Sequence, residues 1–83
     1  MKKFKIDRTI IVEEEVALND YIRFKVKELR KKRGYSQETF GKMIGLSRVS
    51  VTNFETGRHH LTTDKLYLVC VALRVKSSDI LPF

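Results

Sequence analysis

The stretch from Ser36 to Gly57, SQETFGKMIGLSRVSVTNFETG, decides how the rest of the chain is organised. It has the pattern of two short helices joined by a glycine-centred turn. Ser36 and Ser47 stand where each helix would begin, because a serine hydroxyl accepts a hydrogen bond from a first-turn N–H group. Gly45 lies between the two helices, where a left-handed backbone conformation costs glycine nothing. The stretch therefore predicts a helix, a tight turn and a second helix.

The two faces of the predicted helices differ in composition. The inward-facing residues at helical spacing are Phe40, Met43 and Ile44 in the first helix and Val51, Phe54 and Glu55 in the second. The rest of the second helix carries Arg48, Val49, Ser50, Thr52 and Asn53. This outward face lacks the Glu and Lys of an ordinary solvated surface. Its residue types are able to contact base edges, phosphates or a thymine methyl group.

The stretch resembles the helix-turn-helix of the Cro/CI-type, lambda-repressor-like (XRE) family at positions that match together: Ser36-Gln37-Glu38, Phe40-Gly41, Ile44-Gly45-Leu46-Ser47, Val51 and Phe54-Glu55-x-Gly57. The resemblance extends from about Asn19 to Leu81 and implies an all-α, five-helix lambda-repressor-like DNA-binding domain. One departure is Gly41, where the family usually has alanine. Either residue lets the two helices approach closely, but glycine in mid-helix costs about 1 kcal/mol more.

The chain divides into an N-terminal strand or arm over residues 1–18 and a helix-turn-helix DNA-binding domain over residues 19–83. The head contains apolar and β-branched residues with partial alternation, which predict a short β-strand: Phe4, Ile6, Ile10, Ile11 and Val12. Its unpaired edge needs cover, and three alternatives are open: pairing with the same strand of a second subunit, packing on its own helices, or a flexible arm. The first helix is expected to begin at Asn19 or Asp20 and to run to about Arg33.

Two more helices are expected after Gly57. Thr62 or Thr63 would begin the fourth, whose core stripe is Leu66, Val69, Cys70 and Leu73. Residues 75–82 predict a short fifth helix capped by Ser77 or Ser78. Its apolar residues Ile80, Leu81 and Phe83 either complete the core or offer a dimer patch. The habit of the resembled family to dimerise through its last helix favours the patch.

Composition and charge limit the classes of function. Eighty-three residues suffice for one domain, whose small core makes a dimer partner a natural supplement. The net charge is +7, with −1 on residues 1–22 and +8 on the remainder. Residues 23–33 hold seven basic residues against Glu28 alone. Such a run is usually a solvated helix face, but beside a helix-turn-helix it favours contact with a polyanion.

Several classes find no support in the sequence. Cys70 is the single cysteine, so an intrachain disulfide is excluded. No apolar run approaches the roughly 20 residues of a membrane span, and no signal-type segment is present, so we expect a cytoplasmic protein without membrane contact. Adjacent His59 and His60 lack metal-ligand spacing. With no phosphate loop, no histidine spaced with a nucleophile and no carboxylate pair, we expect no catalytic residue, metal, cofactor or small-molecule ligand.

The resemblance implies which residues of the second helix face bases in the major groove: Arg48, Val49, Ser50 and Asn53. Arg48 suits the O6 and N7 atoms of guanine, a pairing worth about 1–3 kcal/mol of discrimination. Val49 suits a thymine methyl group, and Asn53 suits adenine. The base that each residue reads stays open.

Phosphate contacts would position this helix. Gln37 matches the family's phosphate-binding glutamine, and the free N–H groups at that helix terminus attract the same anion. Further candidates are Ser47, Thr52, Arg58, Lys42 and His59. The family also pairs an arginine at position 30 with the glutamate at position 55. Such a partly buried Arg30–Glu55 pair would fix the angle between the first and third helices more than it adds net stability.

These features predict a sequence-specific, DNA-binding transcriptional regulator of a prokaryote or phage. A homodimeric repressor or controller would occupy a palindromic operator on double-stranded DNA through two half-sites about 34–36 Å apart. The competing class is an antitoxin or adaptor, in which Leu81, Phe83 and the apolar head bind a partner protein. A surface for RNA or acidic membranes lacks aromatic stacking positions and a strongly amphipathic basic helix.

Overall fold

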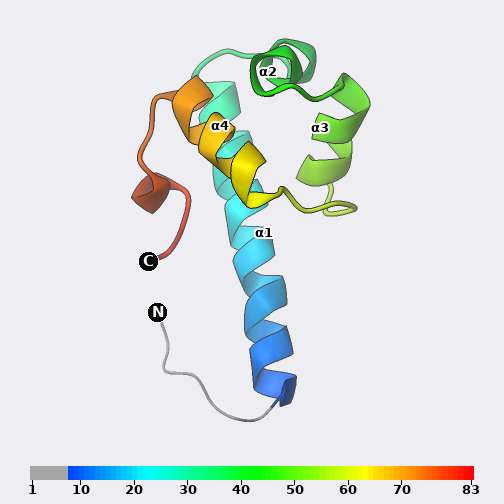
Figure 1. The fold of residues 1–83 in the computed structure, drawn as a ribbon, viewed down its shortest axis with the longest axis vertical. Coiled ribbons are helices and arrows are strands. Elements are labelled where there is room, and N and C mark those ends of the chain that lie inside the picture. Colours follow the sequence, from blue (N-terminus) through cyan, green and yellow to red (C-terminus); the bar gives the residue numbers. More distant parts are fainter. Residues whose placement is uncertain (1–7) are drawn as a thin grey trace.

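The computed structural model describes residues 8–83, with side-chain surroundings from residue 17 onward. Its elements are the helices α1 (Arg8–Lys32), α2 (Gln37–Ile44), α3 (Arg48–Glu55) and α4 (Thr63–Leu73), and the 3-10 turn η1 (Ser77–Asp79). The helices α2, α3 and α4 gather around the C-terminal half of α1, and the N-terminal half of α1 extends beyond them (Figure 1). Over residues 8–83, no helix has both the length and the apolar character needed to cross a membrane.

The core lies where the C-terminal half of α1 meets the other helices. Its buried apolar residues come from every helix and from the C-terminal segment: Val26, Phe40, Ile44, Val51, Phe54, Val69, Leu73 and Ile80. Met43, which was expected in this core, is instead 43% exposed. It lies beside the outer face of α4, where it lines a shallow hollow with Leu68 and Val71. The prediction that Met43 is buried is therefore wrong.

The helix starts around the turn are those that the sequence predicts. Ser36, Ser47 and Thr62 each accept a hydrogen bond from the backbone N–H three residues further on, at 3.0, 3.1 and 3.2 Å. Gly45 ends α2 in the left-handed conformation, at a φ of 74°. Local cap chemistry thus fixes both ends of the turn between α2 and α3.

The predicted N-terminal strand is wrong for the residues that the structure describes. Ile10, Ile11 and Val12 lie in α1, which begins at Arg8 instead of at Asn19 or Asp20. Asp20 lies inside the helix, where its Oδ1 accepts from Arg23 Nη2 at 2.7 Å. Once a helix exists, each added residue gains a backbone hydrogen bond, and this gain outweighs the weak strand preference of three β-branched residues. Phe4 and Ile6 lie outside the described residues.

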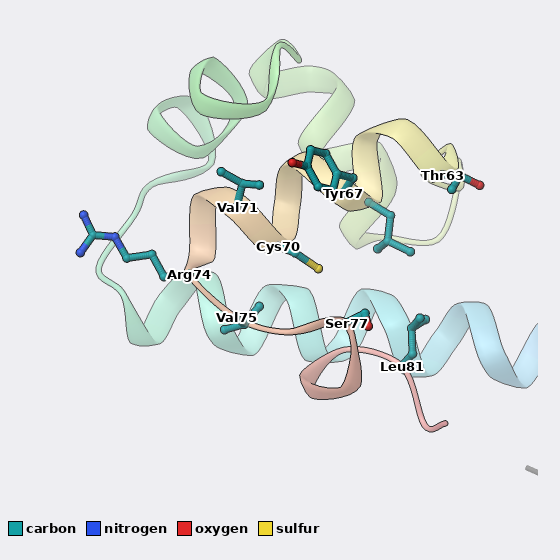
Figure 2. Close-up of a pocket in the computed structure, with 9 residues that line it drawn as sticks. Thr63, Tyr67, Cys70, Val71, Arg74, Val75, Ser77 and Leu81 are labelled. Atoms are coloured by element: carbon teal, nitrogen blue, oxygen red, sulfur yellow. The ribbon is translucent and has the colours of Figure 1, made fainter.

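The C-terminal segment forms one 3-10 turn instead of the expected fifth α-helix. Lys76 precedes this turn, and its backbone N–H donates to Asp79 Oδ2 at 2.9 Å, so neither Ser77 nor Ser78 is the cap. Pro82 disfavours helical conformation at the residue before it, which stops the turn from growing. A hollow of about 620 Å³ lies between this segment and α4 (Figure 2).

Candidate nucleic-acid interface

The close contact between α2 and the turn that follows it sets how α3 leaves α2. The Leu46 N–H donates to the Gly41 carbonyl oxygen at 2.8 Å. A Cβ atom at position 41 would lie 2.5 Å from the Leu46 carbonyl oxygen, which is inside van der Waals contact. Glycine at this position therefore permits a tighter approach of the turn to α2 than a side chain would.

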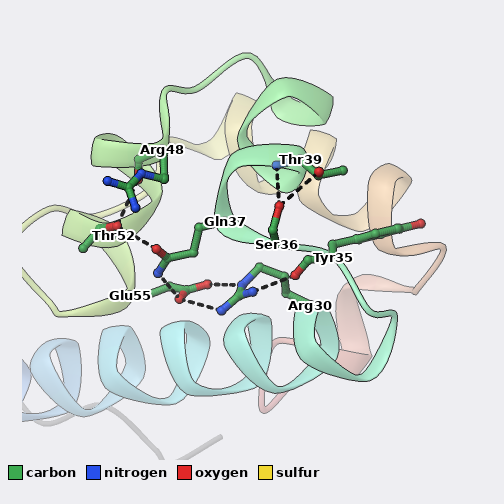
Figure 3. A network of polar contacts seen from close by, with 8 residues as sticks. All are labelled: Arg30, Tyr35, Ser36, Gln37, Thr39, Arg48, Thr52 and Glu55. Carbon is green, nitrogen blue, oxygen red and sulfur yellow. Dashed lines mark hydrogen bonds and ion pairs between the residues drawn. The ribbon is translucent and has the colours of Figure 1, made fainter.

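A buried ion pair joins α1 to the end of α3. Arg30 Nε donates to Glu55 Oε2 at 2.7 Å, and Arg30 Nη2 donates to Glu55 Oε1 at 3.1 Å. The two side chains are 8% and 1% exposed. Arg30 Nη1 also donates to the Tyr35 carbonyl oxygen at 2.7 Å, just before α2 (Figure 3). One guanidinium thus connects α1, the start of α2 and the inner side of α3, and the ion pair of Arg30 with Glu55 is the one that the family resemblance implies.

Gln37 extends this network to the middle of α3. Its Nε2 donates to Glu55 Oε1 at 2.9 Å, and its Oε1 accepts from the Thr52 hydroxyl at 2.9 Å (Figure 3). The Thr52 hydroxyl also lies 3.0 Å from the Arg48 carbonyl oxygen, so its single proton is shared between two acceptors. The bond to Glu55 uses one of the two hydrogens on the Gln37 amide nitrogen, which leaves the other for a further acceptor.

The outer face of α3 is narrower than the sequence suggests. Arg48 is exposed, and Val49 is 63% exposed. Ser50 and Asn53 are half-buried, and Ser50 lines a hollow beside the loop that follows α3. Thr52 turns its hydroxyl inward to Gln37. Of the outward-facing residues expected from the sequence, Arg48 and Val49 are the exposed ones.

The other phosphate candidates are spread over three places. The Ser47 hydroxyl accepts from the Ser50 N–H as the N-cap of α3. Arg58 and His59 are exposed in the loop after α3, and the Asn53 carbonyl oxygen holds their backbone N–H groups at 2.8 and 3.3 Å. Lys42 is exposed in the last turn of α2, away from Gln37 in the first turn. Among the described phosphate candidates, the structure therefore joins Gln37 to Thr52 by a hydrogen bond and places the others on separate segments.

More than half of the basic residues in the run of residues 23–33 make contacts within the chain. Four of its members have partners among the described residues: Arg23 with Asp20, Lys25 with Glu28, Arg30 with Glu55, and Arg33 with the Leu73 carbonyl oxygen at 2.8 Å. Lys27, Lys31 and Lys32 are exposed. The run is thus partly a set of structural contacts and not one continuous cationic stripe.

Two basic residues that the sequence did not single out contact the segments that flank α3. Lys65 Nζ, on α4, donates to the Ile44 carbonyl oxygen at 2.9 Å and lies 3.4 Å from that of Gly45. The Arg23 guanidinium lies against Gly57, with Cζ 3.3 Å from the place of a Cβ atom there. Apolar periodicity carries no signal for such contacts, because each joins a side chain to backbone from another part of the chain.

Replacing Lys65 with methionine is expected to lower the free energy of unfolding by about 1–2 kcal/mol, because the two carbonyl groups at the end of α2 lose a charged donor. Urea denaturation followed by circular dichroism measures this change. Lys42→Met is the matched control, since Lys42 is exposed, and it is expected to change stability by less than about 0.5 kcal/mol. Equal losses in both variants would contradict a specific role for Lys65.

The fold and this site define a helix-turn-helix protein. A short helix ends at a left-handed glycine, and a second short helix follows a serine cap, is held by a buried ion pair and faces outward with an arginine and a valine. The chain belongs to the helix-turn-helix family HTH_3, whose model matches residues 26–80. The resemblance to Cro/CI-type, XRE-type DNA-binding proteins is thereby confirmed.

Individual relatives agree with this family. YgzD, an uncharacterised HTH-type transcriptional regulator of Bacillus subtilis (strain 168), is 38% identical over 56 residues, which are 68% of this chain and 85% of YgzD. The restriction-modification controller protein C.AhdI of Aeromonas hydrophila is 26% identical with a TM-score of 0.71, over 77% of this chain and 97% of that protein. The P22 c2 repressor, solved with a synthetic operator, is 25% identical with a TM-score of 0.66, over 72% of this chain and 91% of that one.

Proposed function

We propose that this protein is a sequence-specific DNA-binding transcriptional regulator, a repressor or controller that binds a palindromic operator as a homodimer. The observation that carries the proposal is the position of α3, whose inner side is held by the buried Arg30–Glu55 pair while Arg48 and Val49 face outward. The operator complex of the P22 c2 repressor and the controller role of C.AhdI support the same function here.

Base recognition falls mainly to the exposed start of α3. In a major groove, Arg48 would donate to guanine and Val49 would contact a thymine methyl group. Ser50 and Asn53 are half-buried, so they would reach bases only from the edge of the exposed face of α3. We therefore assign most of the sequence discrimination to Arg48 and Val49, with Asn53 one turn further on as a partner for adenine.

Phosphate binding would centre on the start of α2. The second amide hydrogen of Gln37 and the first N–H groups of α2 present donors to one phosphate. Arg58 and His59 would contact the backbone beyond the other end of α3, where both are exposed. Contacts at both ends of α3 would hold it in the groove without reading sequence. Ser47, Thr52 and Lys42 would add to this set.

Two variants test the proposal by gel-shift titration against the DNA upstream of the protein's own coding region and against random duplex. Arg48→Ala is expected to lose about 1–3 kcal/mol of binding to the preferred sequence while weak, salt-sensitive association persists. Arg58→Ala is expected to weaken both duplexes alike and to reduce the salt slope by about 1. Equal binding of the wild-type protein to both duplexes at moderate salt would exclude the proposed function as a sequence-specific regulator.

An antitoxin or adaptor remains the second candidate, because α4 exposes apolar side chains that a partner protein could cover. Tyr67 is 69% exposed and Val71 is 57% exposed. This candidate gains if the protein shows no DNA selectivity and forms a stoichiometric complex with a partner protein, and if Val71→Lys abolishes that complex while Arg48→Ala leaves it intact.

A further inference from the structure

The outer side of α4 is an apolar surface left open in the monomer. Tyr67, Leu68 and Val71 are 69%, 36% and 57% exposed. Tyr67 and Val71 lie on the side of α4 that faces away from α1, and the hollow beside them contains Cys70 and Leu81 (Figure 2). Burial, with a smaller effect of the Asp79 carboxylate, raises the pKa of the Cys70 thiol, so this side chain adds no negative charge to the hollow near neutral pH. Aromatic and aliphatic side chains so exposed on a small domain mark a contact surface.

Opposite charges flank this surface at the two ends of the same helix face. Asp64 lies in the first turn of α4, and Arg74 is its C-cap. Both are exposed. Asp64, Tyr67 and Val71 have spacings of three and four residues, which place them on one side of α4. Arg74 follows three residues further on as the left-handed C-cap and lines the same hollow as Tyr67 and Val71. The stripe therefore reads acidic, aromatic, aliphatic and basic, with the same spacing from either end.

Such a stripe is complementary to a copy of itself that runs in the opposite direction. A two-fold axis on the exposed side of α4, at the level of residue 69 along the helix, places Asp64 opposite Arg74 of the partner subunit and Tyr67 opposite Val71 of the partner subunit. Both ion pairs and both apolar contacts then occur twice, as a two-fold interface requires. Two parallel copies would instead place like charges side by side.

We propose that two copies of this chain associate through antiparallel α4 helices, with Asp64 and Arg74 as reciprocal ion pairs around Tyr67 and Val71. This inference rests on the proposed function, since it names the surface of the proposed homodimer. The surface belongs to α4, so the pairing leaves Arg48 and Val49 on α3 uncovered. The eleven residues of α4 span only about 16 Å, so the interface falls below the usual 800 Å² per partner and the free dimer is weak.

Charge reversal and mixing test the pairing by sedimentation equilibrium of the free full-length protein. Asp64→Arg alone and Arg74→Asp alone each place two like-charge pairs at the interface, and each is expected to weaken self-association about tenfold. An equimolar mixture of the two variants restores opposite charges at both ends and is expected to regain wild-type association. Loss in both single variants without recovery in the mixture would overturn the pairing.

A second pair of variants tests the apolar centre. Val71→Lys is expected to weaken self-association by about a hundredfold, because a charge would be buried against Tyr67 of the partner subunit. Phe24→Lys is the matched control, since Phe24 is 64% exposed on α1 and lies outside the stripe. An effect of Phe24→Lys without one of Val71→Lys would overturn the inference.

Failure of this inference is distinguishable from failure of the proposed function. If the protein selects its upstream DNA and the Val71→Lys variant dimerises normally, the proposed function stands and the α4 interface is refuted. If the Asp64→Arg and Arg74→Asp variants behave as expected in sedimentation but the protein binds all DNA alike, the α4 interface stands and the proposed function is refuted. A wild-type protein that stays monomeric at every concentration and binds one and two copies of its upstream site without cooperativity refutes the α4 pairing.

Discussion

Glu55→Ala is expected to lower the free energy of unfolding by about 3–5 kcal/mol, because it leaves the buried Arg30 guanidinium without its counter-charge. The change also removes the acceptor of the Gln37 amide. A domain of this size has a total stability of about 4–12 kcal/mol, so the loss is a large part of the whole. Thermal and urea unfolding measure it, and the same variant is expected to lose DNA selectivity because α3 loses its tie to α1.

Three further variants show how much of the loss in Glu55→Ala comes from the burial of the unpaired Arg30 charge. Asp20→Ala breaks the exposed Asp20–Arg23 pair and is expected to cost no more than about 1 kcal/mol. Glu55→Gln keeps an oxygen acceptor for Arg30 and provides a milder form should Glu55→Ala fail to fold. Arg30→Met combined with Glu55→Leu is expected to be more stable than Glu55→Ala, since no buried charge remains. A double variant less stable than Glu55→Ala would contradict this account.

Gly41→Ala is expected to lower the free energy of unfolding by about 1–3 kcal/mol, although alanine is the better helix former by about 1 kcal/mol. The added methyl group would lie 2.5 Å from the Leu46 carbonyl oxygen, and backbone there yields only by moving the turn. A displaced turn changes the direction of α3, so weaker selectivity for the preferred DNA should accompany the loss of stability. Urea unfolding and gel-shift titration measure the two effects.

Lys42→Ala is the control for the propensity effect, because Lys42 is the next residue of α2 and is exposed. It is expected to change stability by less than about 0.5 kcal/mol. If Gly41→Ala proved more stable than the wild type, the turn would have room for a methyl group. The usual alanine of the family would then be tolerated here as well.

Local chemistry explains which parts of the fold were predictable from the sequence. Ser36, Gly45 and Ser47 fix the ends of α2 and α3 through hydrogen bonds and one left-handed residue, and each of these effects depends on a few neighbouring residues. The caps therefore follow from residue type and spacing alone. The buried side of α3, with Val51 and Phe54, follows likewise from helical periodicity.

The two chain ends were mispredicted for a shared reason. Within the described residues, the strand prediction rests on Ile10, Ile11 and Val12, and α1, which contains all three, overrides their strand preference. At the other end, Ser77 and Ser78 resemble caps, but Asp79 closes a shorter turn on Lys76. At both ends, neighbouring structure overrides a short local preference, and residue spacing carries no signal for that neighbouring structure.

The residues of the candidate site were more predictable from the sequence than the hydrogen bonds that join them. The resemblance to the family pairs Arg30 with Glu55, and the two side chains do form an ion pair. Residue type and spacing do not predict the bonds from Gln37 to both Thr52 and Glu55, because these bonds join side chains of two different helices. The assignment of individual residues to bases and phosphates stays a prediction for the variants above to test.

The Gln37 network has a consequence for the thermodynamics of DNA binding. Immobilising a flexible side chain on association costs about 0.5–1.5 kcal/mol. Gln37 is already restrained by Thr52 and Glu55, so this loss of rotamer freedom is incurred during folding. Thr52→Val would release one end of the amide, and its effect should appear in calorimetry as a less favourable binding entropy.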